Sequence, residues 1–391
     1  MTARARLLHF AVIFFWGGLS SFALSTESGG VYQALAIVPA LLFCLLLPSH
    51  GAFGGAMRGQ AFFLVCLGAA MACASALFNG FTDMGLLRYL ALIPAYLVMA
   101  LSARDPSRRL DALQAFALAG LVFCAAHAGE IDPGRILDPS FRIELFLNTN
   151  GVGFIAGMTL LTHAILLAAP GAGGPSVAMR LYHGSSMAGT GLILFLTRSR
   201  TAFMACLAGL AALACARWLG KLSWKRTLWS AGTLALALIL WGGRLFSSLA
   251  DYYSLFGKYR NISNATNRTE IWSYVWDEII ANHPFLGVGP GLHGDLVERG
   301  IGFSSAHNGV LMYLAEIGVL GTLPYLIVFF TGLRRALKDP ALRTLVLPLL
   351  VAGGVESMAE TMFFSTGNVG SLLFLFALVV STMGFGAAHP L

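Results

Sequence analysis

His307 has the residue type and the sequence setting of a general base. Ser304-Ser305-Ala306-His307-Asn308 precedes a long apolar run, so we expect Ser305 to cap a helix that has His307 in its first turn. The positive end of the helix dipole disfavours an imidazolium there, so His307 should be neutral and able to accept a proton. The structural alternative is an interfacial histidine that hydrogen-bonds a loop carbonyl.

Arg268 is the strongest candidate for binding an anion. Asn267-Arg268-Thr269-Glu270 has the pattern of a capping box, and the apolar residues that follow it recur at helical spacing: Ile271, Trp272, Val275, Trp276, Ile279 and Ile280. Arg268 then occupies the first helical position, where free backbone N–H groups and the helix dipole add to its positive charge. The alternative is an ion pair between Arg268 and a nearby carboxylate.

Arg198 and Arg200 lie in a tight turn, Thr197-Arg198-Ser199-Arg200, between two short apolar runs. Ser199 is a candidate N-cap for a helix that begins at Arg200. Snorkelling towards lipid headgroups is one explanation of these cations. Because the turn has little length to spare, we favour phosphate binding, to which guanidinium groups are suited.

The remaining polar groups of this region fit weaker patterns. Gly287-Val288-Gly289-Pro290-Gly291 is either a simple tight turn or a stretch whose bare backbone approaches a ligand. His283, His293, Asp295, Glu298 and His307 match no metal-ligand spacing. We therefore expect neither a metal nor another cofactor.

The elements that position these residues are membrane helices. Hydrophobic residues make up 57% of the chain and charged residues 11%, far from a soluble domain. The cysteines form no ligand-like motif, and we interpret them as small core residues. We predict one all-α polytopic membrane domain, 1–391, with about twelve spans. These lie near 7–24, 31–48, 61–79, 85–103, 110–128, 150–169, 183–197, 200–217, 227–246, 307–332, 343–364 and 368–387. The first resembles a signal peptide, but the further spans favour a retained helix.

Orientation follows from where Lys and Arg fall when the N-terminus is placed inside. Most of them then lie in cytoplasmic loops, but a set remains at the outer face: Arg88, Arg135, Arg142, Arg198, Arg200, Arg244, Lys258, Arg260, Arg268 and Arg299. The insertion rule disfavours that side, so their presence needs a functional explanation. The long outer loop 247–306, between the ninth and tenth spans, contains the motifs above and is predicted to form a helical cap.

The block 268–321 carries a family resemblance. Arg268 with Trp272, His283-Pro284-Phe285-Leu286-Gly287-Val288-Gly289, Ala306-His307-Asn308, and Glu316-Ile317-Gly318 to Gly321 follow in order the pattern of the O-antigen ligase family. Ser199-Arg200 resembles the outward Ser-Arg turn of that family. Asn148-Thr149-Asn150 is similar to its Asn-Pro-Asn segment, with threonine in place of proline.

The resemblance implies a GT-C-like, metal-independent, inverting glycosyltransferase of the bacterial inner membrane, with its active site facing the periplasm. Its donor would be an undecaprenyl-pyrophosphate-linked glycan and its acceptor the lipid A core oligosaccharide. Membrane lipid would be a further partner, and nucleic acid would not. The implied catalytic residues are His307 as base, with Arg268 and Arg200. The implied substrate-binding residues are Arg198, Arg88, Asn308, His283, Gly287 and Gly289.

Two alternatives remain open. A polymerase of the same family would use the same donor and transfer it to another undecaprenyl-linked glycan. A polysaccharide flippase or secondary transporter would place ionisable groups at the centres of its helices. Those centres are nearly free of charge here, apart from Glu316, Glu356 and Glu360, and no internal repeat is evident.

Overall fold

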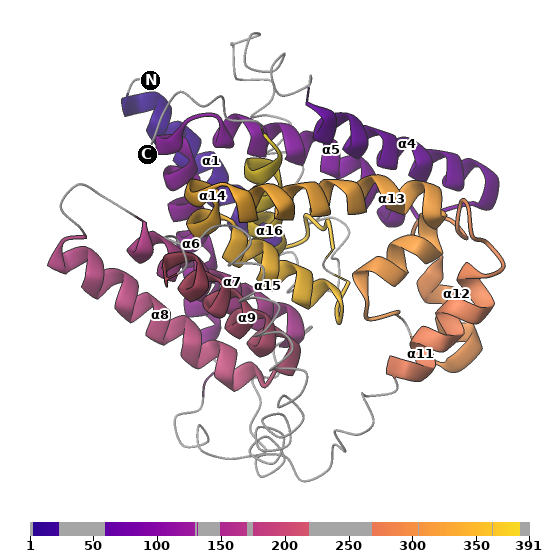
Figure 1. Cartoon of the computed structure of the whole chain (residues 1–391). Coiled ribbons are helices and arrows are strands. Elements are labelled where there is room, and N and C mark those ends of the chain that lie inside the picture. The colour runs from indigo at the N-terminus through magenta and orange to yellow at the C-terminus, as the bar shows by residue number, and fades with distance from the viewer. Residues whose placement is uncertain are drawn as a thin grey trace.

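The computed structural model describes residues 3–22, 59–129, 131, 149–169, 175–218, 268–303, 305–361 and 363–383, which form helices and no strand (Figure 1). The predicted spans 31–48 and 227–246, the capping residue Asn267 and the first part of the outer loop, 247–267, lie outside the described residues. The all-α prediction is confirmed for the part of the chain that is described.

Six helices are long and apolar enough to cross a membrane. They are α4 (Gln60–Asn79), α5 (Asp83–Ala103), α6 (Pro106–Ala128), α7 (Thr149–Ala168), α9 (Arg200–Trp218) and α13 (Gly309–Lys338). Shorter apolar segments lie within α1 (Ala3–Phe22), α15 (Leu347–Ser357) and α16 (Val369–Thr382). The chain is therefore a polytopic membrane protein, while the total of about twelve spans stays a prediction.

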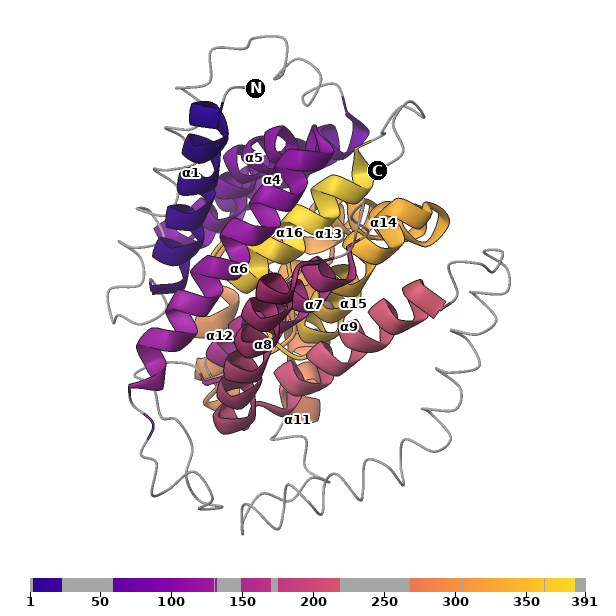
Figure 2. The ribbon, with the colours of Figure 1, turned by 90° about the vertical axis from the view of Figure 1, so that its left-hand side faces the viewer.

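The core is centred on α16, whose residues are all buried. This helix contacts α1, α5, α6, α7, α13 and α15, and α1 lies alongside α6 at the edge of the bundle (Figure 2). Close packing depends on small residues: a Cβ on Gly353 would come within 2.2 Å of the Phe374 ring, so a larger residue would separate α15 from α16.

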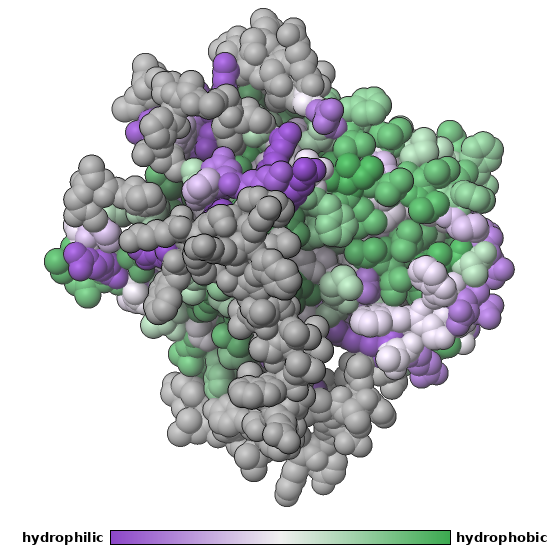
Figure 3. Space-filling model, viewed as in Figure 1, coloured by the Kyte–Doolittle hydropathy of each residue, from purple (hydrophilic) through white to green (hydrophobic). Residues whose placement is uncertain are grey.

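One face of the bundle is apolar where a soluble protein would be polar. Leu77 and Phe78 on α4 are 86% and 77% exposed, and Leu323 and Phe330 on α13 are also exposed. These helices form a continuous hydrophobic surface in Figure 3, with more hydrophilic residues gathered near the end where α12 lies. Such a band fits the hydrocarbon of a bilayer.

Two predicted spans differ from the observed helices. The expected run 183–197 is part of a longer helix, α8 (Val177–Thr197), because the Ser176 side chain accepts a hydrogen bond from the Met179 N–H and caps it earlier. The expected run 343–364 is broken into α14 (Pro340–Leu345) and α15, with Pro348 in the first turn of α15. Since α15 ends at Ser357, Glu360 lies in the turn that follows it.

Helix α13 consists of two helices joined at Gly318, which has φ 64° and ψ −173°. The first helix spans 309–317 and the second spans 319–338. The second has roughly the length needed to cross about 30 Å of hydrocarbon. At this kink the loop 283–291 packs against α13. Val288 and Gly289 N–H groups donate to the Ala315 and Glu316 carbonyls, and the Val319 N–H donates to the Pro284 carbonyl.

The described part of the predicted cap, 268–303, consists of α11 (Arg268–Tyr274), the π-helix η4 (Val275–Ile280) and α12 (His293–Ile301). Its apolar face packs into a small core of its own: Ile271, Val275, Ile279, Ile280, Val288, Val297, Ala306 and Ala315. The amphipathic helix predicted from Arg268 onwards is confirmed. Figure 1 places α11 and α12 beyond the end of α13 that is far from α14.

Candidate active site

The helix ends that the charge pattern assigned to the outer face lie together at one end of the bundle. The start of α7 packs against the turn between α8 and α9, since a Cβ on Gly153 would come within 2.8 Å of the Ser199 side chain. The Asn150 amide at that start donates to Glu360, and the Asn308 amide donates to the Met358 carbonyl over 3.0 Å. The ends of α7, α13 and α15 thus enclose one polar region.

Glu360 is the centre of this region. Its side chain is 2% exposed, and its Oε1 accepts hydrogen bonds from Asn150 over 2.7 Å and from the Arg268 guanidinium over 2.8 Å. Its Oε2 lies 3.5 Å from Nδ1 of His307. A carboxylate so deeply buried needs charged and hydrogen-bonding partners, and segments distant in sequence supply them. The ion pair between Arg268 and a carboxylate, the alternative to anion binding, is therefore observed. The Arg268 side chain is still 18% exposed.

His307 precedes the helix instead of lying in its first turn, so that prediction was wrong. Asn308, not Ser305, is the N-cap of α13: its Oδ1 accepts from the Val310 and Leu311 N–H groups, each over 3.0 Å. An asparagine side chain satisfies the free N–H groups of a helix as well as serine does. The Ser305 hydroxyl instead accepts from the His307 N–H over 3.2 Å.

The backbone at His307 is in the left-handed region, with φ 46°. Among the described residues, only two other non-glycine residues share this conformation, Arg198 and Phe364. Left-handed backbone costs roughly 1–2 kcal/mol per residue and is often retained at functional sites. The indole N–H of Trp272 donates to the adjacent Ala306 carbonyl over 3.0 Å and fixes the turn to α11.

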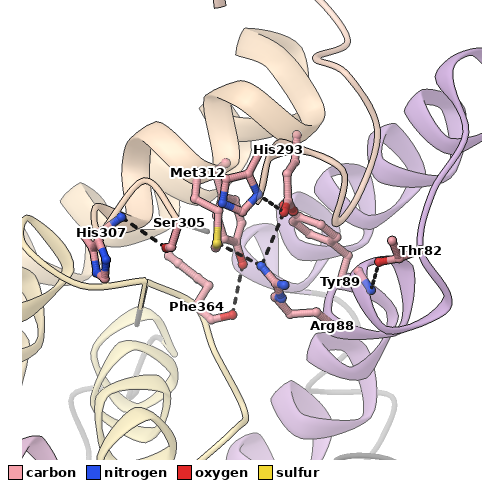
Figure 4. A network of polar contacts seen from close by, with 11 residues as sticks. Thr82, Arg88, Tyr89, His293, Ser305, His307, Met312 and Phe364 are labelled. Atoms are coloured by element: carbon pink, nitrogen blue, oxygen red, sulfur yellow. Dashed lines mark hydrogen bonds and ion pairs between the residues drawn. The ribbon is translucent and has the colours of Figure 1, made fainter. Parts of the chain in front are cut away.

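A second buried carboxylate, Glu316, lies further along α13 and contacts Tyr89, His293 and Arg88, all labelled in Figure 4. Its Oε2 accepts from the Tyr89 hydroxyl over 2.6 Å, and its Oε1 lies 2.6 Å from Nδ1 of His293. The Arg88 guanidinium is 3.7 Å from Oε1 and donates to the Met312 sulfur over 2.9 Å. This group joins α5, α12 and α13.

The glycine-rich loop approaches protein backbone. A Cβ on Gly287 would come within 2.4 Å of the Glu316 carbonyl carbon, and one on Gly289 within 2.2 Å of the Gly80 carbonyl oxygen. Both glycines have positive φ. They therefore hold the loop against α13 and α4, which makes any part in substrate binding indirect. His283, at the start of the loop, is exposed.

The turn with the two arginines has its predicted form. Ser199 Oγ accepts from the Ala202 N–H over 3.3 Å, as an N-cap of α9 does, and Arg200 begins that helix. Arg198 is the left-handed C-cap of α8. Arg200 is exposed and Arg198 is partly exposed, at the end of the bundle that holds the Glu360 carboxylate.

The histidines considered as metal ligands are separated by the fold. His293 contacts Glu316, whereas His307 contacts Glu360. Within the part of the chain that the structure describes, no three His, Cys, Asp or Glu side chains gather as a metal-ligand group.

From the sequence, no role was assigned to Glu360, Glu316, Tyr89 or Asn150. The acidic residues stood out as rare charges inside apolar runs, which is a recognised signal of function in membrane proteins. Glu316 and Asn150 also lie in segments that resemble the family pattern, whereas Tyr89 gave no signal, because a tyrosine near a helix end is common at membrane interfaces.

These features define an integral membrane protein in which a buried glutamate, Glu360, contacts a partly exposed histidine and arginine at one end of the helix bundle. Residues 185–326 match the family model described as O-antigen ligase, the family that the block 268–321 resembles. The matched range includes Arg198, Arg200, Arg268 and His307. Enzymes of this family are ligases and polymerases that act on glycans. No curated protein matches the chain.

Proposed function

We propose that the protein is an O-antigen ligase, which transfers undecaprenyl-pyrophosphate-linked O-antigen polysaccharide to the lipid A core oligosaccharide at the periplasmic face of the inner membrane. The observation that carries this proposal is the position of Glu360 between His307 and Arg268. One buried carboxylate orients a base and a guanidinium towards the same region, and glycosyl transfer from a lipid pyrophosphate needs both groups.

His307 is the general base. Glu360 Oε2 lies 3.5 Å from Nδ1, and a carboxylate on that side favours the tautomer with its proton on Nδ1 and with Nε2 as the acceptor. Nε2 takes the proton of the acceptor hydroxyl as its oxygen attacks the anomeric carbon of the donor sugar. The bond from that carbon to the pyrophosphate oxygen breaks, and its electron pair leaves with undecaprenyl pyrophosphate. Attack from the opposite side inverts the configuration.

The arginines bind the donor pyrophosphate and stabilise the charge that develops on it. Within the described residues, Arg268 donates to Glu360 through one nitrogen, and its other N–H groups can donate to phosphate. Arg200 and Arg198 lie on the neighbouring turn, and Arg88 lies against the second turn of α13. This cationic group replaces a metal ion in charge stabilisation. Asn308 holds the turn of His307 in place.

A polymerase of the same family is the second candidate, because the donor site would be the same. The two differ in the acceptor, which is lipid A core for a ligase and another undecaprenyl-linked glycan for a polymerase. The compact arrangement of the reactive residues late in the chain favours the ligase. A flippase or secondary transporter is less favoured, because two of the buried acidic residues, Glu316 and Glu360, are paired with residues at the outer ends of the helices.

The glycolipid profile of a deletion strain tests the proposal. Loss of a ligase leaves lipid A core without O-antigen while lipid-linked polymer accumulates. A single repeat unit on the core would instead identify a polymerase, and an unchanged profile would contradict both candidates.

A further inference from the structure

Arg88 has few protein partners for a guanidinium that is only 28% exposed. It donates to the Met312 thioether, a weak acceptor, and lies 3.7 Å from Oε1 of Glu316, beyond hydrogen-bond distance. Arginine beside a buried carboxylate usually forms a short, often bidentate pair. Among the described residues, Arg88 therefore has a counter-charge nearby while most of its N–H groups are unused.

The carboxylate of Glu316 is already occupied by other donors. Tyr89 donates to Oε2 over 2.6 Å, and His293 is 2.6 Å from Oε1, where facing a carboxylate places its proton on Nδ1. Each oxygen thus has one short contact from a buried side chain, and Figure 4 shows Tyr89, His293 and Arg88 gathered in one group of polar contacts. A closer approach of Arg88 would compete with these two contacts for the same carboxylate.

These contacts leave most N–H groups of Arg88 free to point towards the start of α13. Met312 is four residues past Asn308, the N-cap of α13, so Arg88 contacts α13 near the end that His307 precedes. A guanidinium that is neutralised in charge but free to donate suits the anionic part of a lipid pyrophosphate.

We infer that Tyr89 and His293 are positioning residues, which engage both oxygens of Glu316 in short hydrogen bonds and so hold Arg88 available to the pyrophosphate of the donor. This inference rests on the proposed function, because it concerns how that donor is bound. Loss of either contact frees a carboxylate oxygen, Arg88 closes onto it, and the affinity for the donor falls while the base is untouched.

The test measures the affinity of the full-length protein in detergent for undecaprenyl pyrophosphate, a probe that needs no transfer reaction. Arg88→Ala should weaken binding about tenfold and Tyr89→Phe about fivefold, as loss of a charged hydrogen bond does. The double variant should bind no more weakly than Arg88→Ala, because Tyr89 acts through Arg88. His293→Ala frees the other oxygen and should change affinity in the same direction.

Tyr313→Phe is the matched control. Tyr313 is also fully buried and packs against the Tyr89 ring, but its hydroxyl donates to the Phe364 carbonyl over 3.0 Å. It should lower the melting temperature much as Tyr89→Phe does and leave affinity unchanged. The inference would be overturned if Tyr89→Phe and His293→Ala both bind with wild-type affinity, or if the effects of Tyr89→Phe and Arg88→Ala are fully additive. Either result would leave the proposed function intact. A wild-type protein that does not bind the probe would contradict the proposed donor, and the inference with it.

Discussion

Nδ1 of His307 lies 3.5 Å from Oε2 of Glu360, while Oε1 of the same carboxylate accepts a 2.8 Å hydrogen bond from Arg268. The candidate base and a candidate phosphate ligand therefore share one buried counter-charge. Displacement of either would disturb the other, which makes their coupling measurable.

Glu360→Gln tests that coupling. The amide keeps the shape of the side chain but loses the charge that faces His307 and Arg268, so turnover should fall on the order of a hundredfold. Asn150→Ala is the control. It removes a neutral donor to Oε1 of Glu360 and leaves the contacts of this carboxylate with Arg268 and His307. It should cost about 1 kcal/mol, roughly fivefold in rate at most. Equal turnover of Glu360→Gln and the wild type would contradict the role of the carboxylate.

Arg268 and Arg200 should each be needed as arginine. Alanine at either position should weaken donor use severely, and lysine should restore little, because a point charge does not reproduce bidentate phosphate contacts. Arg268→Lys is the more informative variant, since an ammonium can retain the ion pair with Glu360. Initial rates with purified donor and acceptor provide the measurement. Near-wild-type rates for the lysine variants would contradict bidentate binding of phosphate by these arginines.

Activity should not need a divalent cation, because arginines supply the positive charge that a metal provides in many phosphate-handling enzymes. Protein treated with a chelator and then freed of it should keep its full rate. If the rate is lost and then restored by added magnesium or manganese, a metal site must be sought again.

Gly318→Ala should destabilise the protein through the kink of α13. Its φ is positive, and a Cβ would come within 2.2 Å of the Phe285 carbonyl group. Gly302 is the matched control: it also has positive φ, but nothing lies within 4 Å of its Cβ position. Both variants place alanine at positive φ, but Gly318, with ψ −173°, has a conformation essentially confined to glycine, whereas Gly302 is left-handed helical. Gly318→Ala should therefore lose about 2 kcal/mol more, from this conformation and the displaced loop together. Thermal unfolding in detergent compares them, and equal melting temperatures would mean that the loop is not tightly held.

The sequence was sufficient to predict features set by local chemistry. Runs of apolar residues located the helices, Ser199 identified the start of α9, and the spacing from Ile271 to Ile280 predicted the helix of the cap. Each depends on residues within a few turns of one another, which is the range over which capping and periodicity act.

Features that depend on distant residues could not be predicted in this way. Glu360 meets Arg268 from 92 positions away, and Glu316 meets Tyr89 from 227 positions away. Asn308 was preferred over Ser305 as a cap because the left-handed turn at His307 starts the helix later. The glycine-rich loop permitted a ligand contact or a turn, and only the fold shows α13 and α4 against it.

The central claim is that His307 accepts the proton of the acceptor hydroxyl. The most direct measurement follows transfer by purified protein from lipid-linked glycan to lipid A core, together with donor affinity and melting temperature, for the wild type, His307→Gln and His307→Asn. Asparagine tolerates the left-handed backbone and glutamine keeps a hydrogen-bonding side chain, so both should fold and bind donor normally. We predict that both turn over on the order of a hundredfold or more slowly. A folded variant of either kind with near-wild-type turnover would contradict the account.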